Sequence, residues 1–427
     1  MKKTFLLSCL MLAAMPVMAA YTGHVYVDKN KNGVFDQSEK PLAGIKVSDG
    51  LNVVETAADG SFTLPGHERE RFIFITTPSG YKTFNRHYHK IEKKQSGYDF
   101  GLIPYSGRIR KDGSHRYIHI TDTEIFNTEN HADWVNNVHD YARNEQAAFI
   151  IHTGDICYEK GLKAHIKLMN TENMDCPVFY CIGNHDLVKG KYGEELFESI
   201  YGPVYYSFDA GNVHYVVTPM PGGDHAPGYT SDDVCRWLKN DLAHIRPGTP
   251  VVVFNHDLLT YEDTFIFKSK NAGSINLNEY NLKAWVYGHW HINYMKKQGD
   301  VYSVCTSSLD KGGIDHSTTA FRVMHVDSKG DFTSELRYTY LDKNICIASP
   351  AGVMASGVLP VAVNVYSSVS PVREVLYTCL ADGKPVLKNK RLLQSTDWSW
   401  NGELPLSHKY VGKELTLRVT ARFNNGE

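Results

Sequence analysis

The sequence lacks a strong net charge and any long apolar run beyond its first twenty residues. Its 427 residues include 45 Lys and Arg against 47 Asp and Glu, which gives a formal charge of −2. A nearly neutral protein has no net attraction to nucleic acid or anionic lipid, so no specific nucleic-acid partner is predicted. No later segment holds 18 consecutive apolar residues, so no transmembrane anchor is predicted either.

A paired set of cysteines is also missing. Of the eight cysteines, Cys9 belongs to the leader described next, and the other seven show no tight spacing. An odd number without a regular pattern argues against a disulfide framework. The composition is otherwise ordinary, with 42% hydrophobic and 22% charged residues. At this length it predicts a globular protein with more than one domain.

The first twenty residues have the three parts of a signal peptide. Lys2 and Lys3 form a positive start, a short apolar stretch follows, and Ala19 and Ala20 suit cleavage. The alternative is a lipoprotein signal at Cys9, but that cysteine lies too near the start. We therefore predict a signal peptide over residues 1–20, cleaved near Ala19 or Ala20, and a mature protein that is periplasmic or secreted.

Three segments with different hydrophobic patterns follow the leader. Residues 21–104 show short alternating runs between turn residues, which predicts a β-sandwich module. Residues 105–345 alternate strand-like and helix-like runs, as an α/β domain does. Residues 346–427 return to strand-like runs and predict a second β-sandwich. The central strands are expected at residues 117–120, 149–152, 178–182, 215–217, 251–254 and 284–287.

Two helices of the central segment are indicated by apolar stripes. Trp134, Val138 and Tyr141 fall on one helical face. A second stripe, which includes Trp237, follows Ser231, and Ser231 is the predicted N-cap. Both stripes are interpreted as faces that pack on the core.

Candidate metal ligands come directly after five of the central strands. They are Asp122, Asp155, the run Asn184-His185-Asp186, His256, and the pair His289 and His291. Ends of parallel strands meet along one edge of a sheet, so these side chains are expected to lie together. Carboxylate oxygens and imidazole nitrogens suit divalent ions such as Mn, Fe, Zn or Ni.

In this order the motifs resemble those of the calcineurin-like metallophosphoesterases, over about residues 116–310. The family's series is D-x-H, G-D, G-N-H-D/E, a single His and G-H-x-H. The resemblance implies an α/β (α+β) metallophosphoesterase sandwich, here with two flanking all-β sandwich domains of the kind attached to bacterial members.

The resemblance also implies roles for individual residues. Asp122 and His291 would bind a first metal ion, and Asp155 would bridge two ions. The second ion would be bound by Asn184, His256 and His289. His185 resembles the residue that protonates the leaving oxygen, oriented by Asp186.

The first motif departs from the family pattern, because Glu124 stands where a histidine is usual. A glutamate can supply an oxygen to the first metal and favours harder ions. The alternative ligand is Tyr158, since Gly154-Asp155-Ile156-Cys157-Tyr158 matches the G-D-x-x-Y motif of purple acid phosphatases, in which the tyrosine binds ferric iron. Both Glu124 and Tyr158 stay open at this point.

A separate loop in the first module has the spacing of a calcium site. Acidic and amide side chains alternate from position 28, with a glycine at the sixth place. The predicted ligands are Asp28, Asn30, Asn32, the carbonyl of Val34, Asp36 and Glu39. The alternative is a plain turn with solvated charges. If calcium binds, we expect it to stiffen the module.

The sequence therefore predicts an exported hydrolase of phosphate mono- or diesters that activates a bridging water between two divalent or mixed-valent metal ions. Small phosphate esters, including phosphorylated glycans, lipids or nucleotides, are the predicted substrates. Two alternatives remain: a purple acid phosphatase-type monoesterase that uses Tyr158 and ferric iron, and a non-catalytic, calcium-stiffened binding or adhesive protein.

Overall fold

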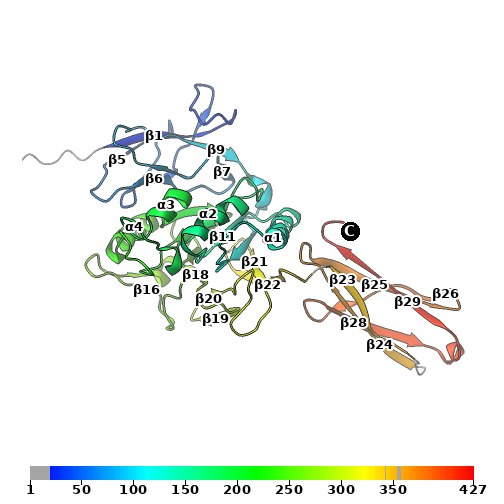
Figure 1. Cartoon of the computed structure of the whole chain (residues 1–427). Coiled ribbons are helices and arrows are strands. Elements are labelled where there is room, and N and C mark those ends of the chain that lie inside the picture. The colour runs from blue at the N-terminus through cyan, green and yellow to red at the C-terminus, as the bar shows by residue number, and fades with distance from the viewer. Residues whose placement is uncertain (1–19, 342, 353–356) are drawn as a thin grey trace, which may run out of the picture.

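The computed structural model describes residues 20–341, 343–352 and 357–427. The predicted signal peptide, apart from Ala20, lies outside these residues. Three units follow one another along the chain, and Figure 1 shows the central one between the blue N-terminal module and the orange and red C-terminal sandwich. Within the described residues, no helix combines the length and apolarity needed to cross a membrane.

The N-terminal module is a pair of facing sheets. One has the order β2-β1-β9-β7, with β5 paired to β1, and the other has the order β4-β3-β6-β8. Alternate residues of these strands point inward to a core that includes Val25, Leu64 and Ile73. The strands are β1 (Tyr21–Val27), β2 (Lys40–Pro41), β3 (Lys46–Ser48), β4 (Val53–Glu55), β5 (Ser61–Leu64), β6 (Phe72–Ile75), β7 (Tyr81–Thr83), β8 (Tyr88–Lys90) and β9 (Phe100–Pro104).

The central domain contains two mixed sheets, of order β12-β11-β10-β21-β22 and β13-β14-β15-β18-β20-β19. Its helices are α1 (Ala132–Asn144), α2 (Tyr158–Leu168), α3 (Glu195–Tyr201) and α4 (Ser231–Ala243). The first sheet is built from β10 (His115–Ile120), β11 (Phe149–His152), β12 (Val178–Tyr180), β21 (Ala320–Val326) and β22 (Phe332–Tyr338). The second is built from β13 (Tyr206–Ala210), β14 (Val213–Val217), β15 (Val251–Phe254), β18 (Leu282–Tyr287), β19 (Tyr294–Gln298) and β20 (Val301–Cys305). A small hairpin of β16 (Ile266–Phe267) and β17 (Ile275–Asn276) lies beside it.

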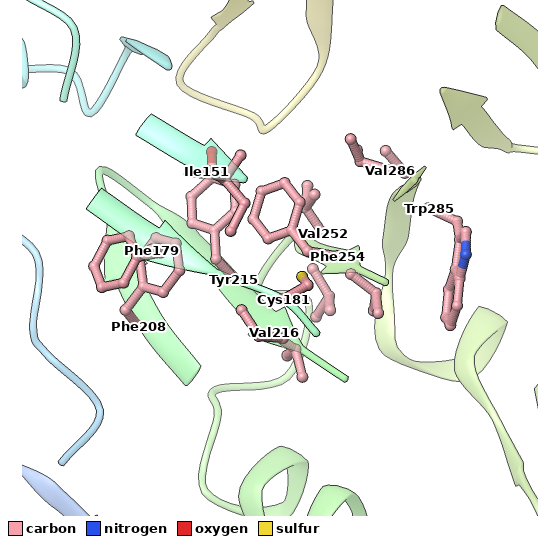
Figure 2. Packing of buried hydrophobic residues seen from close by; sticks show 14 of the residues in the cluster. Ile151, Phe179, Cys181, Phe208, Tyr215, Val216, Val252, Phe254, Trp285 and Val286 are labelled. Atoms are coloured by element: carbon pink, nitrogen blue, oxygen red, sulfur yellow. The ribbon is translucent and has the colours of Figure 1, made fainter. Parts of the chain in front are cut away.

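Aromatic rings fill the space between the two sheets. Phe179 stacks on Phe208 with ring centroids 3.8 Å apart, and Tyr215 stacks on Phe254 at 5.7 Å. Figure 2 shows these rings beside the aliphatic side chain of Ile151. The apolar faces of α1 and α2 pack in a second cluster with β10 and β11, and α4 packs against the sheet that contains β14 and β15. The burial of whole aromatic side chains makes this core the main stabilising feature of the domain.

Helix α4 begins one residue earlier than predicted, because its N-cap is Thr230 and not Ser231. Thr230 is the N-cap, and its hydroxyl accepts a hydrogen bond from the Asp233 amide at 3.2 Å. The Asp233 carboxylate in turn accepts from the amide of Thr230 at 2.9 Å. The reciprocal pair is a capping box, and Ser231 is the first residue inside the helix.

The C-terminal sandwich has its own core, which includes Val363, Tyr377 and Trp400. Its sheets are β23-β24-β28-β27 and β26-β25-β29. The domain boundary was expected at residue 346, whereas the first strand of this sandwich starts at Asn344. The strands are β23 (Asn344–Ser349), β24 (Gly357–Tyr366), β25 (Val372–Ala381), β26 (Lys384–Arg391), β27 (Leu393–Gln394), β28 (Ser399–Leu406) and β29 (Leu415–Phe423).

The N-terminal module is joined to the central domain by a buried ion-pair group. Arg71 lies 2.7 Å from Glu194 and 2.8 Å from Glu198, both of which are buried. Glu194 also accepts hydrogen bonds from the amide of Gly228. Apolar contacts adjoin this group, because Phe74 packs against Trp237 of α4 with ring centroids 6.3 Å apart.

Candidate metal centre

The predicted ligands lie along one edge of the two sheets, where parallel strands end. β10 pairs in parallel with β11, and β11 with β12. In the other sheet, β15 pairs in parallel with β18. The structure therefore brings the five strand ends together as the sequence predicted.

One group of ligand atoms is formed by Asp122, Glu124 and His291. These atoms all lie within 4.8 Å of one another. Nε2 of His291 is 3.1 Å from Oδ1 of Asp122 and 3.4 Å from Oε1 of Glu124. Oδ2 of Asp122 is already engaged, because it accepts from the hydroxyl of Thr121 and from the amide of His289. The free Oδ1 is thus the atom turned toward His291.

A second group is formed by Asp155, His256 and His289, whose ligand atoms also lie within 4.8 Å of one another. Nε2 of His256 is 3.2 Å from Oδ2 of Asp155. Its Nδ1 is 2.7 Å from the carbonyl of Thr153, which orients the ring so that Nε2 faces the group. Burial opposes a charge on His256, but the Asp155 carboxylate outweighs it and raises the pKa of His256 to about 10.

Three buried polar atoms of these residues have no hydrogen-bond partner among the described residues. They are Oδ1 of Asp122, Oδ1 of Asn184 and Nε2 of His256. The short contacts of Asp122 and His256 with their neighbours do not have hydrogen-bond geometry. Leaving such atoms unsatisfied in a protein interior costs about 1–3 kcal/mol each. The two Oδ1 atoms are acceptors, and Nε2 of His256 is one when the ring is neutral and carries its proton on Nδ1, toward the carbonyl of Thr153. The site therefore fits bound metal ions.

The backbone around the centre is strained. Among the described residues, fifteen non-glycine residues have positive φ, and seven of them belong to this edge. The seven are Asp122, Glu124, Asp155, Cys157, Tyr158, His289 and His291. Left-handed backbone costs an ordinary residue on the order of 1 kcal/mol and persists where function requires a side-chain direction.

The interaction predicted between Asp186 and His185 is not formed. Both Asp186 oxygens accept backbone amides, from Gly183 and Asp155 at Oδ2 and from Cys157 at Oδ1, each at 2.9 Å. Burial and the charge of Asp155 raise the pKa of Asp186 to about 7. Asp186 is the last residue of the short turn Asn184–Asp186. Asp186 therefore holds the loops of the centre in place.

Asp224 takes the position beside His185 that was predicted for Asp186. Its Oδ2 lies 2.8 Å from Nδ1 of His185. Partial burial opposes the charge of His185, but the hydrogen bond to Asp224 and the nearby Asp155 raise the pKa of the imidazole. The sequence contained only a weak signal for Asp224, an acidic residue in a loop after a strand. Its pairing depends on the fold of residues 218–230.

The two alternatives for the first group differ in position. Glu124 lies with Asp122 and His291, and Nζ of Lys311 is 2.5 Å from its Oε2. Tyr158 is 44% exposed, and its ring lies 5.3 Å from that of His185. The contact of Lys311 was not predicted, and it places a positive charge beside Glu124.

The predicted calcium loop folds tightly around its acidic residues. Asp28 accepts from the amides of Asn32 and Gly33, and Glu39 accepts from the amide of Lys29 at 2.8 Å. Oδ2 of Asp36 accepts from the side-chain amides of Asn30 and Asn32. Asp28 is 1% exposed, so its charge is held mainly by backbone dipoles.

Comparison with known proteins finds family matches for the N-terminal module and for the central domain. Residues 115–293 match the family described as calcineurin-like phosphoesterase, and residues 29–104 match the N terminal of calcineurin-like phosphoesterase. The chain belongs to the calcineurin-like phosphoesterase family. A curated relative, purple acid phosphatase 13 of Arabidopsis thaliana, is 26% identical over 215 residues, or 47% of this chain. The chain spans 36% of that relative's length.

Solved structures similar to this family member include an archaeal phosphodiesterase, with 13% identity and a TM-score of 0.27 over 52% of this chain and 99% of the other. Another is phosphopantetheinyl hydrolase from Mycobacterium tuberculosis, with 14% identity and a TM-score of 0.30 over 46% and 91%. Likenesses at this level add nothing to the assignment.

Proposed function

We propose that the protein is an exported, metal-dependent phosphoesterase. The observation that carries this proposal is the pair of ligand groups, together with the three buried atoms that lack partners. Asp122, Glu124 and His291 are the proposed ligands of one ion. Asn184, His256 and His289 are the proposed ligands of the other, and Asp155 lies between the two sets.

Ions bound at these groups supply positive charge that polarises a phosphate ester and makes the attacking water more acidic. The chain's own contribution is orientation. Thr153 fixes the ring of His256, and the amide of His289 fixes the carboxylate of Asp122. His185, held by Asp224, is placed to donate a proton to the leaving oxygen as the phosphorus–oxygen bond breaks.

The proposed substrates are small phosphate mono- or diesters met outside the cytoplasm. Membership of the family supports ester hydrolysis, and the leader composition supports export. Glu124 is the proposed ligand rather than Tyr158 because it is already grouped with Asp122 and His291. The purple acid phosphatase alternative predicts a visible tyrosinate-to-iron absorption band that disappears in Tyr158→Phe.

Metal removal tests the proposed activity. After chelation, hydrolysis of p-nitrophenyl phosphate and bis-p-nitrophenyl phosphate is expected to fall to background. Add-back of Mn, Fe, Zn or Ni is expected to restore it, because the donor set suits these ions. The preferred ester identifies mono- or diesterase activity. Absence of turnover with every metal, and of transition metal in the purified protein, would overturn the proposal and favour a binding protein.

We also propose that the loop from Asp28 to Glu39 binds calcium. Both terminal carboxylates are buried, and calcium would add a charge that backbone dipoles alone do not supply. Calcium at a hundredfold over its Kd is expected to raise the unfolding free energy by about 2.7 kcal/mol, measured by denaturant titration. Glu39→Gln is expected to remove most of this gain. A parent protein that is equally stable in calcium and in chelator would contradict the site.

A further inference from the structure

Two aromatic side chains stand exposed beside the metal centre. Phe126 is 54% exposed and Tyr158 is 44% exposed, although both types usually bury most of their surface. Their rings are nearly parallel, with an angle of 18° and centroids 6.3 Å apart. Phe126 follows the first metal motif in sequence, and Tyr158 is the first residue of α2.

Tyr158 combines a strained backbone with an exposed ring, and both features lower the stability of the folded protein. Its backbone has φ of 56°, a conformation that an aromatic residue rarely adopts. The preceding residue, Cys157, is also left-handed, with φ of 76°. This backbone turns the ring outward, where the folded protein gains little from it. Strain that presents an apolar ring to solvent at a reaction centre points to a contact with substrate.

One of the two rings lies beside the residue that is proposed to protonate the leaving oxygen. The Tyr158 ring is 5.3 Å from that of His185, the proposed proton donor. A group that carries the leaving oxygen to His185 comes close to the Tyr158 ring, and the Phe126 ring extends the same surface. A planar ring gains most from such a surface, because flat faces stack with full contact area.

We propose that the leaving group of the substrate carries a planar ring that stacks on Phe126 and Tyr158. Two substrate classes have this chemistry: aryl phosphates, with the ring on the ester oxygen, and nucleotides, with the ring beyond a sugar. The proposal rests on the proposed function, and it assigns Tyr158 to substrate contact rather than to metal binding.

The test compares three esters on the metal-loaded mature protein: p-nitrophenyl phosphate, adenosine 5′-monophosphate and glycerol 1-phosphate, which has no ring. Phe126→Leu keeps apolar bulk but removes the ring. It is expected to raise the KM of a ring-bearing ester about tenfold more than that of glycerol 1-phosphate. Phe126→Tyr restores the ring and is expected to restore the KM. Trp398→Leu removes another exposed ring (41%), from the C-terminal sandwich, and serves as the control.

The ester whose KM rises most in Phe126→Leu identifies the substrate class. Equal KM changes for all three esters in Phe126→Leu would overturn the ring proposal and leave phosphoesterase activity standing. Binding of adenosine 5′-monophosphate can also be measured by calorimetry, which needs no turnover. If the protein binds this nucleotide through Phe126 but hydrolyses no ester, the proposed function is refuted and the ring proposal stands. Tyr158→Phe removes the only atom through which Tyr158 could bind a metal ion, and it is expected to keep the bound metal. Loss of metal in that variant would overturn the assignment of Tyr158.

Discussion

Asp155→Asn is expected to lower phosphoester hydrolysis on the order of a thousandfold or more. The side chain contributes to the group with His256 and His289, and Glu124 and Cys157 lie within 4.8 Å of it in another. An amide removes the negative charge between the two sets and with it several kcal/mol of transition-state stabilisation from bound ions. The measurements are kcat/KM with the best metal and the metal content of the purified variant.

The fold is expected to survive this substitution. Asparagine tolerates the φ of 56° found at position 155, and the backbone bonds to Asp186 and Glu124 do not involve the changed atoms. Asp331→Asn is the matched control, since Asp331 pairs with Lys283 at the opposite end of β21 and β22. If Asp155→Asn kept full activity and metal, the bridging role of Asp155 would be wrong.

His185→Ala is expected to lower kcat strongly, by an amount that depends on the leaving group of the ester. Loss of a positioned general acid costs about a hundredfold or more when the leaving oxygen is a poor one, as in an alkyl phosphate. The p-nitrophenolate anion is stable enough to leave without protonation, so hydrolysis of its ester is expected to slow much less. The measurement is the ratio of kcat values for glycerol 1-phosphate and p-nitrophenyl phosphate.

Asp224→Asn is a milder change that tests the same proton transfer by His185. The amide can still bond to Nδ1 of His185 but carries no charge, so the same substrate ratio is expected to shift in the same direction by a smaller amount. Equal losses for both esters in His185→Ala would show that His185 acts in binding or metal retention and not as the acid.

Much of the central architecture followed from the sequence. The predicted strands at residues 149–152 and 251–254 have the bounds found in the structure, because each is a short buried run with a polar residue directly after it. The α/β sandwich with flanking β-sandwiches is confirmed, and so is the family. Ligand residues were visible because strand ends in parallel sheets converge, a rule that needs no knowledge of loops.

The sequence could not identify contacts made across loops. Asp186 is adjacent to His185 in sequence, yet its carboxylate is taken by three backbone amides, and Asp224, 38 residues further along from Asp186, pairs with the imidazole. Lys311 reaches Glu124 in the same way. The direction of a side chain in a strained loop depends on backbone φ, and neither composition nor periodicity contains that information.

The ion-pair group at Arg71 links the stability of the N-terminal module to that of the central domain. Removing the N-terminal module would take the Arg71 guanidinium away from Glu194 and Glu198, which lie buried beside it. Loss of one partner of a buried ion pair costs several kcal/mol. Removing the module would also uncover the surface of α4 that Phe74 covers. We therefore expect the module and the central domain to unfold together. The C-terminal sandwich has a separate core, and it is also joined to the central domain, because Arg337 donates to the carbonyl of Ser367 and Asn144 donates to that of Val369.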